Sequence, residues 1–402
     1  MKLNLGQKKF VFSFFASLLV CIGSAQKDQS FIQFEYQIGH VAPNYRNFPK
    51  SSILNAYQLN FGKYYTAQDQ DWKNYFDHPL LGVSIGVTDF GQSKLFGQQI
   101  YLTPFFSLKT GDHPFKKMWF RFGLGPAMHT RKYSISNVEN VSIGSTLNWA
   151  FTASMHKYII SKKNFALQLG ISYLHASNAH VQLPNYGLNS GVVSLIYQTK
   201  GIQQWTQSSM PDYQFPRTNY FIHISQGLGL HELGGTERPI GGKKFSIHSI
   251  SICTGIQWRA GFKWRAGFTY RYYPSYANYI IQQDLKEFQN KLKWNASSIH
   301  FLLGFEFLFG HFGADLEGGL TLSKPFYPEF SRRFEKYGNF KYWLKYLFPS
   351  HLQMNYYLFN TAYRPKNNYF IGANISANFG QADFSELVIG YQKNLSRKKA
   401  KP

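Results

Sequence analysis

The sequence predicts an all-β fold, a transmembrane antiparallel β-barrel of about 12–16 strands with long loops. Three observations predict it. Apolar and polar side chains alternate along most of the chain, the alternating runs have the length of a bilayer-crossing strand, and the amino terminus has the pattern of an export signal.

The side-chain period is two in most of the chain. One run puts apolar side chains in one row and small or polar ones in the other: Phe165, Leu167, Leu169, Ile171 and Tyr173 against Ala166, Gln168, Gly170 and Ser172. The same pattern recurs in residues 31–39, 118–125 and 369–376. Strict alternation of this kind is typical of a half-buried strand.

The length of the runs and the nature of the polar row favour a membrane barrel over a secreted β-sandwich, which also alternates. Many runs reach roughly 9–11 residues, as a tilted strand needs to cross a bilayer. The polar row is rich in Gly, Ser, Asn and Gln and includes Arg121, Arg265, Arg271 and Glu306. Such a row suits a barrel interior, and the aromatic ends of the apolar row suit the interfacial girdles.

The amino terminus predicts export. Residues 1–25 combine three early lysines, an apolar stretch over 10–22 and a small-residue end. This is the pattern of a cleaved signal peptide, so we expect residues 26–402 to form one barrel in the cell outer membrane. Loss of Cys21 would leave Cys253 as the single cysteine of the mature chain, which excludes an intrachain disulfide.

Connections between strands are expected to be long in four places. Turn-forming and polar residues gather at 200–218, 228–244, 276–296 and 324–350. The third of these contains a stretch with the pattern of a short amphipathic helix.

Charge and composition exclude several classes of protein. The formal net charge is +23, which in an exported protein favours phosphorylated lipid head groups over nucleic acid. Mean hydropathy is −0.31 and no later run of about 18 apolar residues exists, so a helical membrane protein is excluded. The histidines lack metal-ligand spacing and no phosphate loop or dinucleotide fingerprint occurs, so neither metal nor cofactor is expected.

Two outward rows carry polar side chains near their ends. The row of residues 165–173 continues by parity to His175 and Ser177, and the next outward row, 193–197, reaches back to Asn189. A turn between them would set His175 opposite Asn189. A His and a Ser two residues apart on one face are the minimum for a base-activated nucleophile, which a third group would orient. Spacing alone is more typical of solvated rim residues.

A longer motif surrounds these residues. The string HASNAHVQLPNYGLN at 175–189 resembles the active-site segment of the lipid A 3-O-deacylase family, called PagL, and of acyloxyacyl hydrolase-like proteins. The string VSIGSTLNW at 141–149 is similar to the family's preceding strand, and stretches at 243–251 and 368–392 resemble the carboxyl half of larger exported members. The similarity is strongest over 141–198.

The resemblance implies a membrane-embedded esterase that removes an ester-linked acyl chain from lipopolysaccharide, with lipid A in the outer leaflet as its partner. Ser177 would be the nucleophile, His175 the general base, and Asn178 and Asn185 the support for the oxyanion. The family has a Glu as the third member, where this sequence has Asn189. An amide can orient a histidine but brings no negative charge.

Two other functions fit the same sequence. A non-catalytic barrel, either a pore or a lipid-binding structural protein, would account for the missing acid. An esterase on the same fold could act on phospholipid instead of lipid A. Asp315 and Glu317 could pair for acid–base work, although their spacing suits interior residues of a strand.

Overall fold

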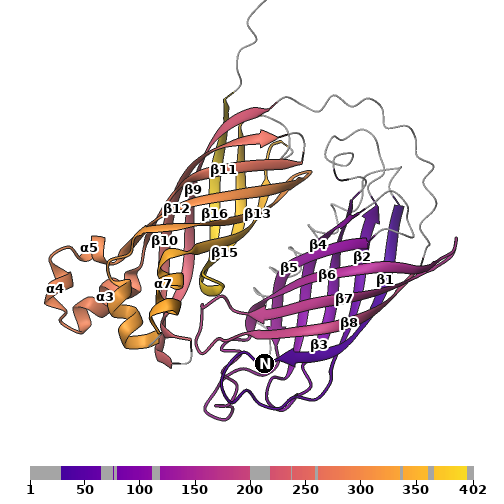
Figure 1. Ribbon diagram of the computed structural model, residues 1–402, viewed down its shortest axis with the longest axis horizontal. Coiled ribbons are helices and arrows are strands. Elements are labelled where there is room, and N and C mark those ends of the chain that lie inside the picture. The colour runs from indigo at the N-terminus through magenta and orange to yellow at the C-terminus, as the bar shows by residue number, and fades with distance from the viewer. Residues whose placement is uncertain are drawn as a thin grey trace, which may run out of the picture.

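The computed structural model describes residues 29–64, 76, 79–110, 118–199, 218–236, 238–258, 261–335, 338–360 and 366–395. The predicted signal peptide and most of the loop expected at 200–218 lie outside these residues. Within them, sixteen strands close into two antiparallel barrels of eight strands each (Figure 1).

The first barrel contains the amino-terminal strands, each paired with its neighbours in the sequence. They are β1 (Gln29–Ala42), β2 (Leu54–Tyr64), β3 (Leu80–Asp89), β4 (Gln98–Lys109), β5 (Met118–His129), β6 (Leu147–Ser161), β7 (Ala166–Ser177) and β8 (Leu188–Gln198). Pairing of β1 with β8, from Gln33 opposite Gln198 to Ala42 opposite Asn189, closes the sheet.

The second barrel is built in the same up-and-down order and closes through β9 and β16. Its strands are β9 (Asn219–Gly235), β10 (Arg238–Trp258), β11 (Phe262–Tyr272), β12 (Ser297–Phe309), β13 (Phe312–Ser323), β14 (Pro349–Tyr357), β15 (Asn368–Asn378) and β16 (Gln381–Leu395). Helical segments lie over one end: α3 (Pro274–Gln282), α4 (Lys286–Gln289), α5 (Leu292–Asn295), α6 (Tyr327–Phe330), η1 (Ser331–Glu335) and α7 (Asn339–Leu347).

The all-β antiparallel barrel class is confirmed, but the single barrel predicted over 26–402 is replaced by two. Alternation shows which face of a strand is apolar, but it does not show after how many strands a sheet closes. The expected loop at 228–244 is also corrected, because β9 and β10 run through it as a hairpin. Its glycines suggest a turn, yet several of them occupy strand positions. The connections at 276–296 and 324–350 hold the helices.

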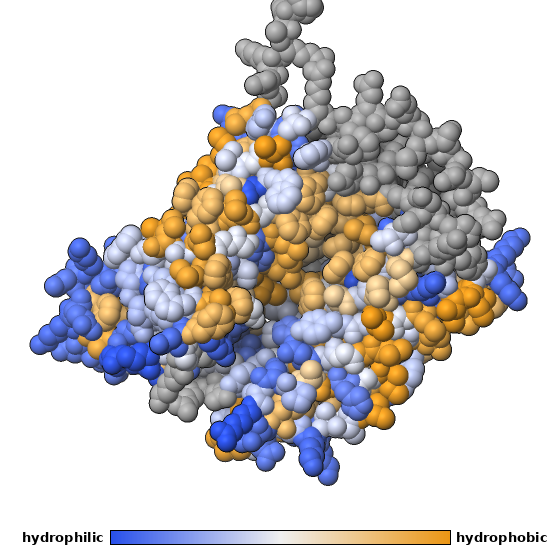
Figure 2. Space-filling model, viewed as in Figure 1, coloured by the Kyte–Doolittle hydropathy of each residue, from blue (hydrophilic) through white to orange (hydrophobic). Residues whose placement is uncertain are grey.

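Large apolar side chains cover the outside of both barrels. Ile171 is 55% exposed and Leu169 47%, whereas the inward-pointing Gln33 and Glu35 are each 1% exposed. Figure 2 shows apolar surface along the barrel walls and hydrophilic surface over the helical segments. An apolar exterior around a polar interior is the arrangement of a lipid-exposed barrel. In the described chain, no helix is long and apolar enough to cross a membrane.

The interiors are filled by polar and charged side chains that pair with one another. In the first barrel Arg121 Nη1 lies 3.1 Å from Glu35 Oε2. In the second, Arg265 contacts both Asp315 and Glu317. The predicted interior row is therefore confirmed, and the two acids form ion pairs with one arginine.

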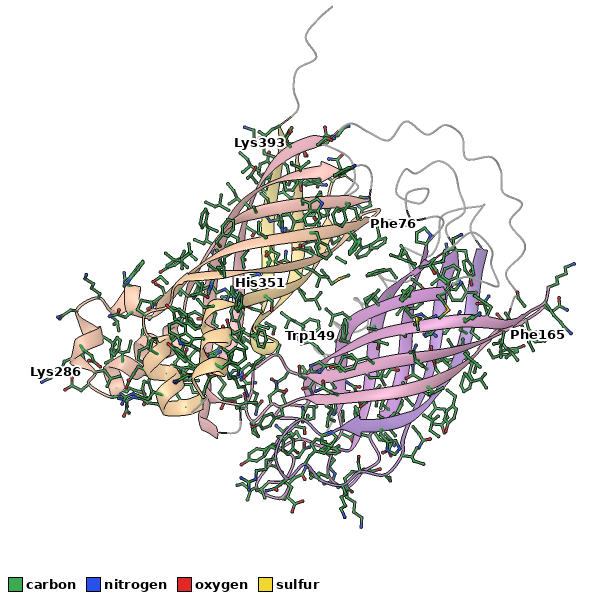
Figure 3. All side chains as sticks on the ribbon, in the orientation of Figure 1. Phe76, Trp149, Phe165, Lys286, His351 and Lys393 are labelled. Atoms are coloured by element: carbon green, nitrogen blue, oxygen red, sulfur yellow. The ribbon has the colours of Figure 1, made fainter. Side chains whose placement is uncertain are left out.

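The barrels contact each other near both ends of their strands. At the ends of β4 and β12, the rings of Phe106 and Phe309 stack with centroids 4.6 Å apart, and Phe76 packs on Phe309 at 4.9 Å (Figure 3). At the other end, the β7–β8 connection binds the β9–β10 hairpin.

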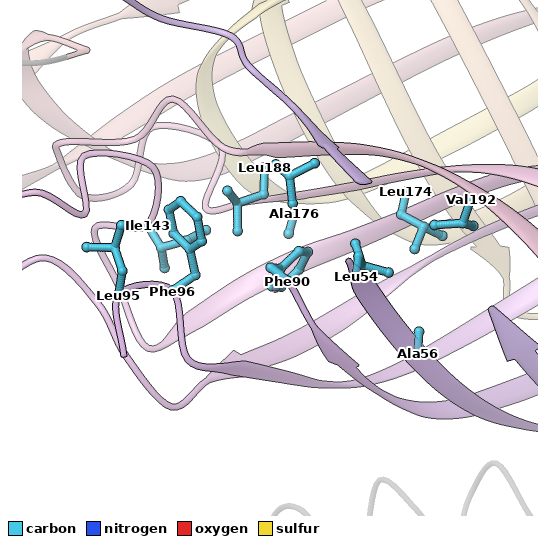
Figure 4. Packing of buried hydrophobic residues seen from close by; sticks show 11 residues of the cluster. Leu54, Ala56, Phe90, Leu95, Phe96, Ile143, Leu174, Ala176, Leu188 and Val192 are labelled. Atoms are coloured by element: carbon cyan, nitrogen blue, oxygen red, sulfur yellow. The ribbon is translucent and has the colours of Figure 1, made fainter. Parts of the chain in front are cut away.

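An apolar cluster closes the first barrel below the β7–β8 connection (Figure 4). It combines strand residues with residues of the neighbouring connections: Val41, Leu54, Ala56, Phe90, Leu95, Phe96, Ile143, Leu174, Ala176, Leu188 and Val192. Leu174, Ala176 and Leu188 point into it from the strands that carry the candidate site, so the cluster fixes the ends of those strands.

Candidate functional site

The β7–β8 pair brings the predicted residues together. His175 lies directly opposite Asn189 in the antiparallel register, as the parity of the two rows predicts. Ser177 ends β7 on the same face, opposite Trp149 of β6, a residue marked in Figure 3. Because successive side chains of a strand point to opposite faces, His175 and Ser177 share the outward face of the barrel.

Hydrogen bonds join the three side chains in series. His175 Nε2 is 2.9 Å from Ser177 Oγ, and His175 Nδ1 is 2.6 Å from Asn189 Oδ1. A carbonyl oxygen can only accept, so Nδ1 carries the proton and Nε2 is left as the acceptor for the serine hydroxyl. This is the tautomer that a general base for Ser177 requires.

Tyr173 is a further member that the sequence reasoning did not include. Its hydroxyl donates to Asn189 Oδ1 at 2.7 Å. Tyr173 lies in the same outward row as His175, so parity could have identified it. Two donors on one oxygen restrain the amide that in turn restrains the imidazole.

The candidate nucleophile is covered although it points outward. Ser177 is only 8% exposed. Gly187 lies beside it with a φ of +71°, and a Cβ there would be 3.0 Å from His175 Cε1 and 3.2 Å from Ser177 Cβ. Glycine therefore meets two needs at this position, the left-handed backbone and the close approach to both side chains.

The segment that resembles the family's preceding strand supports this connection. Gly187 N donates to Ser142 O at 2.9 Å and Tyr186 N to Val141 O at 3.1 Å. A Cβ at Gly144 would clash with the carbonyl oxygen of Pro184. The match at 141–149 thus corresponds to backbone packing around the site.

Asn178 and Asn185 brace the β7–β8 connection. Asn178 N donates to Asn185 Oδ1 at 3.2 Å, and Asn178 Nδ2 donates to Gln182 O at 2.7 Å. Both residues are buried. The side chain of Asn178 is therefore already hydrogen-bonded within the connection. Because Asn185 Oδ1 accepts from Asn178 N, the atom with which the Asn185 side chain can donate a hydrogen bond is Nδ2.

The β1–β2 connection also holds the β7–β8 connection in place, although no sequence pattern around the motif predicts this contact. Asn44 Nδ2 donates to Tyr186 O at 3.0 Å and to Gly187 O at 3.1 Å. Tyr45 stacks on Tyr186 with ring centroids 4.8 Å apart. These residues lie far from the motif in the sequence, so only closure of the barrel places them beside it.

Residues that could hold a metal do not gather in the described ranges, where no group of three or more His, Cys, Asp or Glu side chains has suitable geometry. The site itself offers a serine hydroxyl, an imidazole whose tautomer is set by Asn189, and amide groups.

Such an outward Ser–His–Asn series has the hydrogen-bonded geometry of a serine nucleophile beside a histidine base. Residues 39–198 match the family model described as Lipid A 3-O-deacylase (PagL). The match begins within β1 and ends with β8, so it covers the first barrel and none of the second. The comparison with curated proteins returned no match.

Solved structures of outer-membrane barrels are similar to parts of the chain. The outer membrane enzyme PagL is similar over 42% of this chain and 99% of its own, with 17% identity and a TM-score of 0.30. The outer membrane protein opdK from Pseudomonas aeruginosa is similar over 92% of this chain and 100% of its own, with 8% identity and a TM-score of 0.22.

Proposed function

We propose that the protein is an outer-membrane enzyme that hydrolyses an ester-linked acyl chain of lipid A. The observation that carries the proposal is the hydrogen-bonded series Ser177, His175, Asn189 on the outward face of the first barrel. The match of residues 39–198 to the lipid A 3-O-deacylase family supports the substrate class.

The reaction begins with Ser177 Oγ attacking the ester carbonyl while His175 Nε2 takes the hydroxyl proton. Asn189 and Tyr173 hold the imidazole so that Nε2 faces the serine. Collapse of the tetrahedral intermediate expels the sugar alkoxide, which receives the proton from His175, and leaves an acyl-serine. Water activated by His175 then releases the fatty acid and restores Ser177.

Stabilisation of the developing oxyanion falls to donors of the β7–β8 connection. Asn185 is the better candidate, because the Asn178 side chain is bonded to Gln182 O. A missing oxyanion donor typically costs an enzyme about 10²–10³-fold in kcat. Asn185→Ala would therefore reduce turnover more than it reduces substrate binding.

The position of the site suits a substrate that is already in the membrane. His175 and Ser177 continue a row of lipid-facing apolar side chains, so an acyl ester in the outer leaflet would approach Ser177 from the lipid side, where 8% of this serine is exposed. Passage through the barrel interior is unnecessary. We accordingly place the protein in the cell outer membrane, exported by a signal peptide over residues 1–25.

A non-catalytic lipid-binding barrel is the second candidate, and Asn189 is the observation that favours it. Without a carboxylate, the imidazolium formed during attack by Ser177 has no negative partner in the series. The retained Ser177–His175 hydrogen bond and the fixed tautomer favour the enzyme.

Replacement of Ser177 by alanine tests the proposal. We expect Ser177→Ala to abolish release of 3-hydroxy fatty acid from purified lipid A, measured by mass spectrometry, while the barrel stays folded. Ser246→Ala is the matched control, because Ser246 Oγ lies 3.2 Å from His248 Nε2 on the second barrel, and within the described residues no side chain is seen to hold the other nitrogen of this ring.

Parallel assays separate the alternatives. Release from phospholipid vesicles but not from lipid A would assign the site to phospholipid. No release from either lipid by the folded wild type would support the lipid-binding barrel. Equal release by wild type and Ser177→Ala would remove Ser177 from the mechanism.

A further inference from the structure

The β7–β8 connection of the first barrel, residues 178–187, is bound along its outer side by the second barrel. Leu183 N donates to Glu232 Oε2 at 2.8 Å, and Asn185 N donates to Thr236 O at 3.1 Å. In the reverse direction, Glu232 N donates to His180 O at 3.3 Å. Three hydrogen bonds thus join the segment that carries the candidate oxyanion residues to the end of β9.

Glu232 is buried in this contact, with 1% of its surface exposed. A buried carboxylate is retained only where it is hydrogen-bonded or paired. Leu183 N supplies one bond to it, and Lys244 lies opposite it in the β9–β10 register. A hydrogen bond to a charged group is about twice as strong as a neutral one, so Glu232 holds the connection more firmly than a neutral residue would.

An aromatic contact continues the same junction into the second barrel. The rings of His180 and His231 stack with centroids 5.3 Å apart and an interplanar angle of 19°. His231 Nδ1 is in turn 2.9 Å from Asp383 O on β16. His231, the β9 residue on which His180 stacks, is therefore itself held by β16.

The backbone N–H groups of Leu183 and Asn185 find their hydrogen-bond acceptors on the second barrel and not within the connection. Asn178 ties the two ends through Gln182 and Asn185, but it does not bind these N–H groups. Buried amides without acceptors are costly. Without Glu232 and Thr236, the segment around Asn185 would rearrange to satisfy them and would move relative to Ser177.

We propose that the second barrel positions the active-site connection of the first, with Glu232 as the principal positioning residue. This inference rests on the proposed function, since it gives the second barrel a part in the same reaction. Glu232 fixes Leu183, and Thr236 fixes Asn185 beside the position where the oxyanion forms. A misplacement of about 1 Å in such a site can cost about 10²-fold in rate.

The test uses four variants of the full chain in detergent with purified lipid A. Glu232→Ala removes the acceptor, whereas Glu232→Gln keeps an oxygen that can accept from Leu183 N. Glu287→Ala is the matched control, because Glu287 lies exposed on α4. Phe309→Ala loosens the contact between the barrels at their other end. Heat-dependent migration on detergent gels checks that each barrel is folded.

Two readouts are measured for each variant. We expect Glu232→Ala to lower kcat by tenfold to about 10²-fold with KM within about twofold, and Glu232→Gln to restore most of the rate. Amide hydrogen exchange in a peptide spanning 178–187 should accelerate in Glu232→Ala and stay at the wild-type rate in Glu287→Ala. Phe309→Ala should leave both kcat and this exchange rate near wild type.

The results separate this inference from the proposed function. If wild type is active and Glu232→Ala matches Glu287→Ala in kcat and in exchange, the second barrel does not position the connection. An equal loss in Phe309→Ala would assign the effect to general loosening and would also overturn the role of Glu232. If wild type releases no fatty acid, the proposed function fails, and with it the catalytic part of this inference, while exchange still decides whether Glu232 holds the segment.

Discussion

At the scale of single residues, the oxygen of Asn189 determines what the site can do. It accepts from both His175 Nδ1 and the Tyr173 hydroxyl. Orientation and tautomer selection, two of the tasks of a triad acid, are thus fulfilled by a neutral group. The remaining task, stabilising the imidazolium electrostatically, requires a charge that an amide lacks.

Substitution of Asn189 separates these tasks. We expect Asn189→Asp to raise kcat, because a carboxylate keeps both hydrogen bonds and stabilises the imidazolium formed during attack. The gain should be far smaller than the roughly 10⁴-fold loss seen when a Ser-His-Asp protease loses its acid, since the site is shaped around an amide. Asn189→Ala should lower kcat on the order of tenfold through loss of one orienting hydrogen bond.

The measurement is fatty-acid release from lipid A at saturating substrate. Ser190→Ala is the control, because Ser190 is the next residue of β8 and its side chain points to the inward face, away from His175. This variant should keep the wild-type kcat. If Asp and Ala at 189 both leave kcat at the wild-type value, Asn189 is not the third member of the series.

Sequence parity could predict the central pair but not its whole surroundings. A period of two and a turn between two rows are enough to set His175 opposite Asn189. The contacts of Asn44 and Glu232 with the connection arise from closure of one barrel and docking of the other. Such contacts join residues far apart in the sequence, and no local pattern encodes them.

At the scale of elements, the β7–β8 connection combines a strained backbone with a buried histidine. Ala179 and His180 have φ values of 52° and 66°, which are uncommon for residues other than glycine. Docking on the second barrel therefore has to offset both backbone strain and the desolvation of the His180 imidazole.

This burial predicts that docking weakens in acid. Desolvation, and then the neighbouring His231, lower the pKa of His180 to about 3. In the undocked connection the imidazole would titrate near its ordinary pKa of about 6.5. The docked form binds fewer protons between these values, so docking is fully favourable above about pH 6.5 and is progressively lost as the pH falls toward 3.

The strength of docking at each pH can be measured by amide hydrogen exchange in a peptide spanning 178–187, corrected for the intrinsic effect of pH on exchange. We expect less protection at pH 5 than at pH 7.5 in wild type. His180→Phe keeps the ring stacked on His231 without titrating, so its pH dependence should be smaller. Equal protection of wild type at both pH values would contradict the prediction.

Strands could be predicted well and their connections poorly. The outward rows of β1, β5, β7 and β15 follow directly from alternation. The β9–β10 hairpin was predicted as a long loop because its glycines suggest a turn. A barrel strand can nevertheless contain glycine where neighbouring strands approach closely. A helical pattern was visible only within 276–296, where α3, α4 and α5 lie. The helices of 324–350 pack through aromatic contacts at the end of the barrel, so their positions depend on tertiary structure.

At the scale of the whole molecule, the chain divides one repeating pattern between two closed sheets. Eight strands give an interior just wide enough for side chains to fill it. A single sixteen-stranded barrel would leave an aqueous channel. Two eight-stranded barrels and one sixteen-stranded barrel use the same alternating strands, so the sequence pattern does not distinguish them. The difference matters because only the larger barrel would have an interior wide enough for a pore.

The filled interiors predict that the protein does not conduct ions. In the second barrel, Arg265 contacts Asp315 and Glu317, and Lys263 Nζ lies 3.5 Å from Glu306 Oε2 with its side chain fully buried. A cavity of about 20 Å³ lies beside Arg265, and such a volume holds about one water molecule. We therefore expect the described part of the second barrel to leave no continuous water path for ions past these pairs.

Planar bilayer recording tests this on the intact protein. We expect no reproducible single-channel steps, under conditions in which a sixteen-stranded porin inserted as the control conducts. Arg265→Ala should open no large path either, because Lys263 and Glu306 still fill the next layer of the interior. Steps of constant size in wild type that change in Arg265→Ala would show that ions pass through the second barrel. The second barrel would then be a pore in its own right, and its contact with the β7–β8 connection would have to be explained separately from conduction.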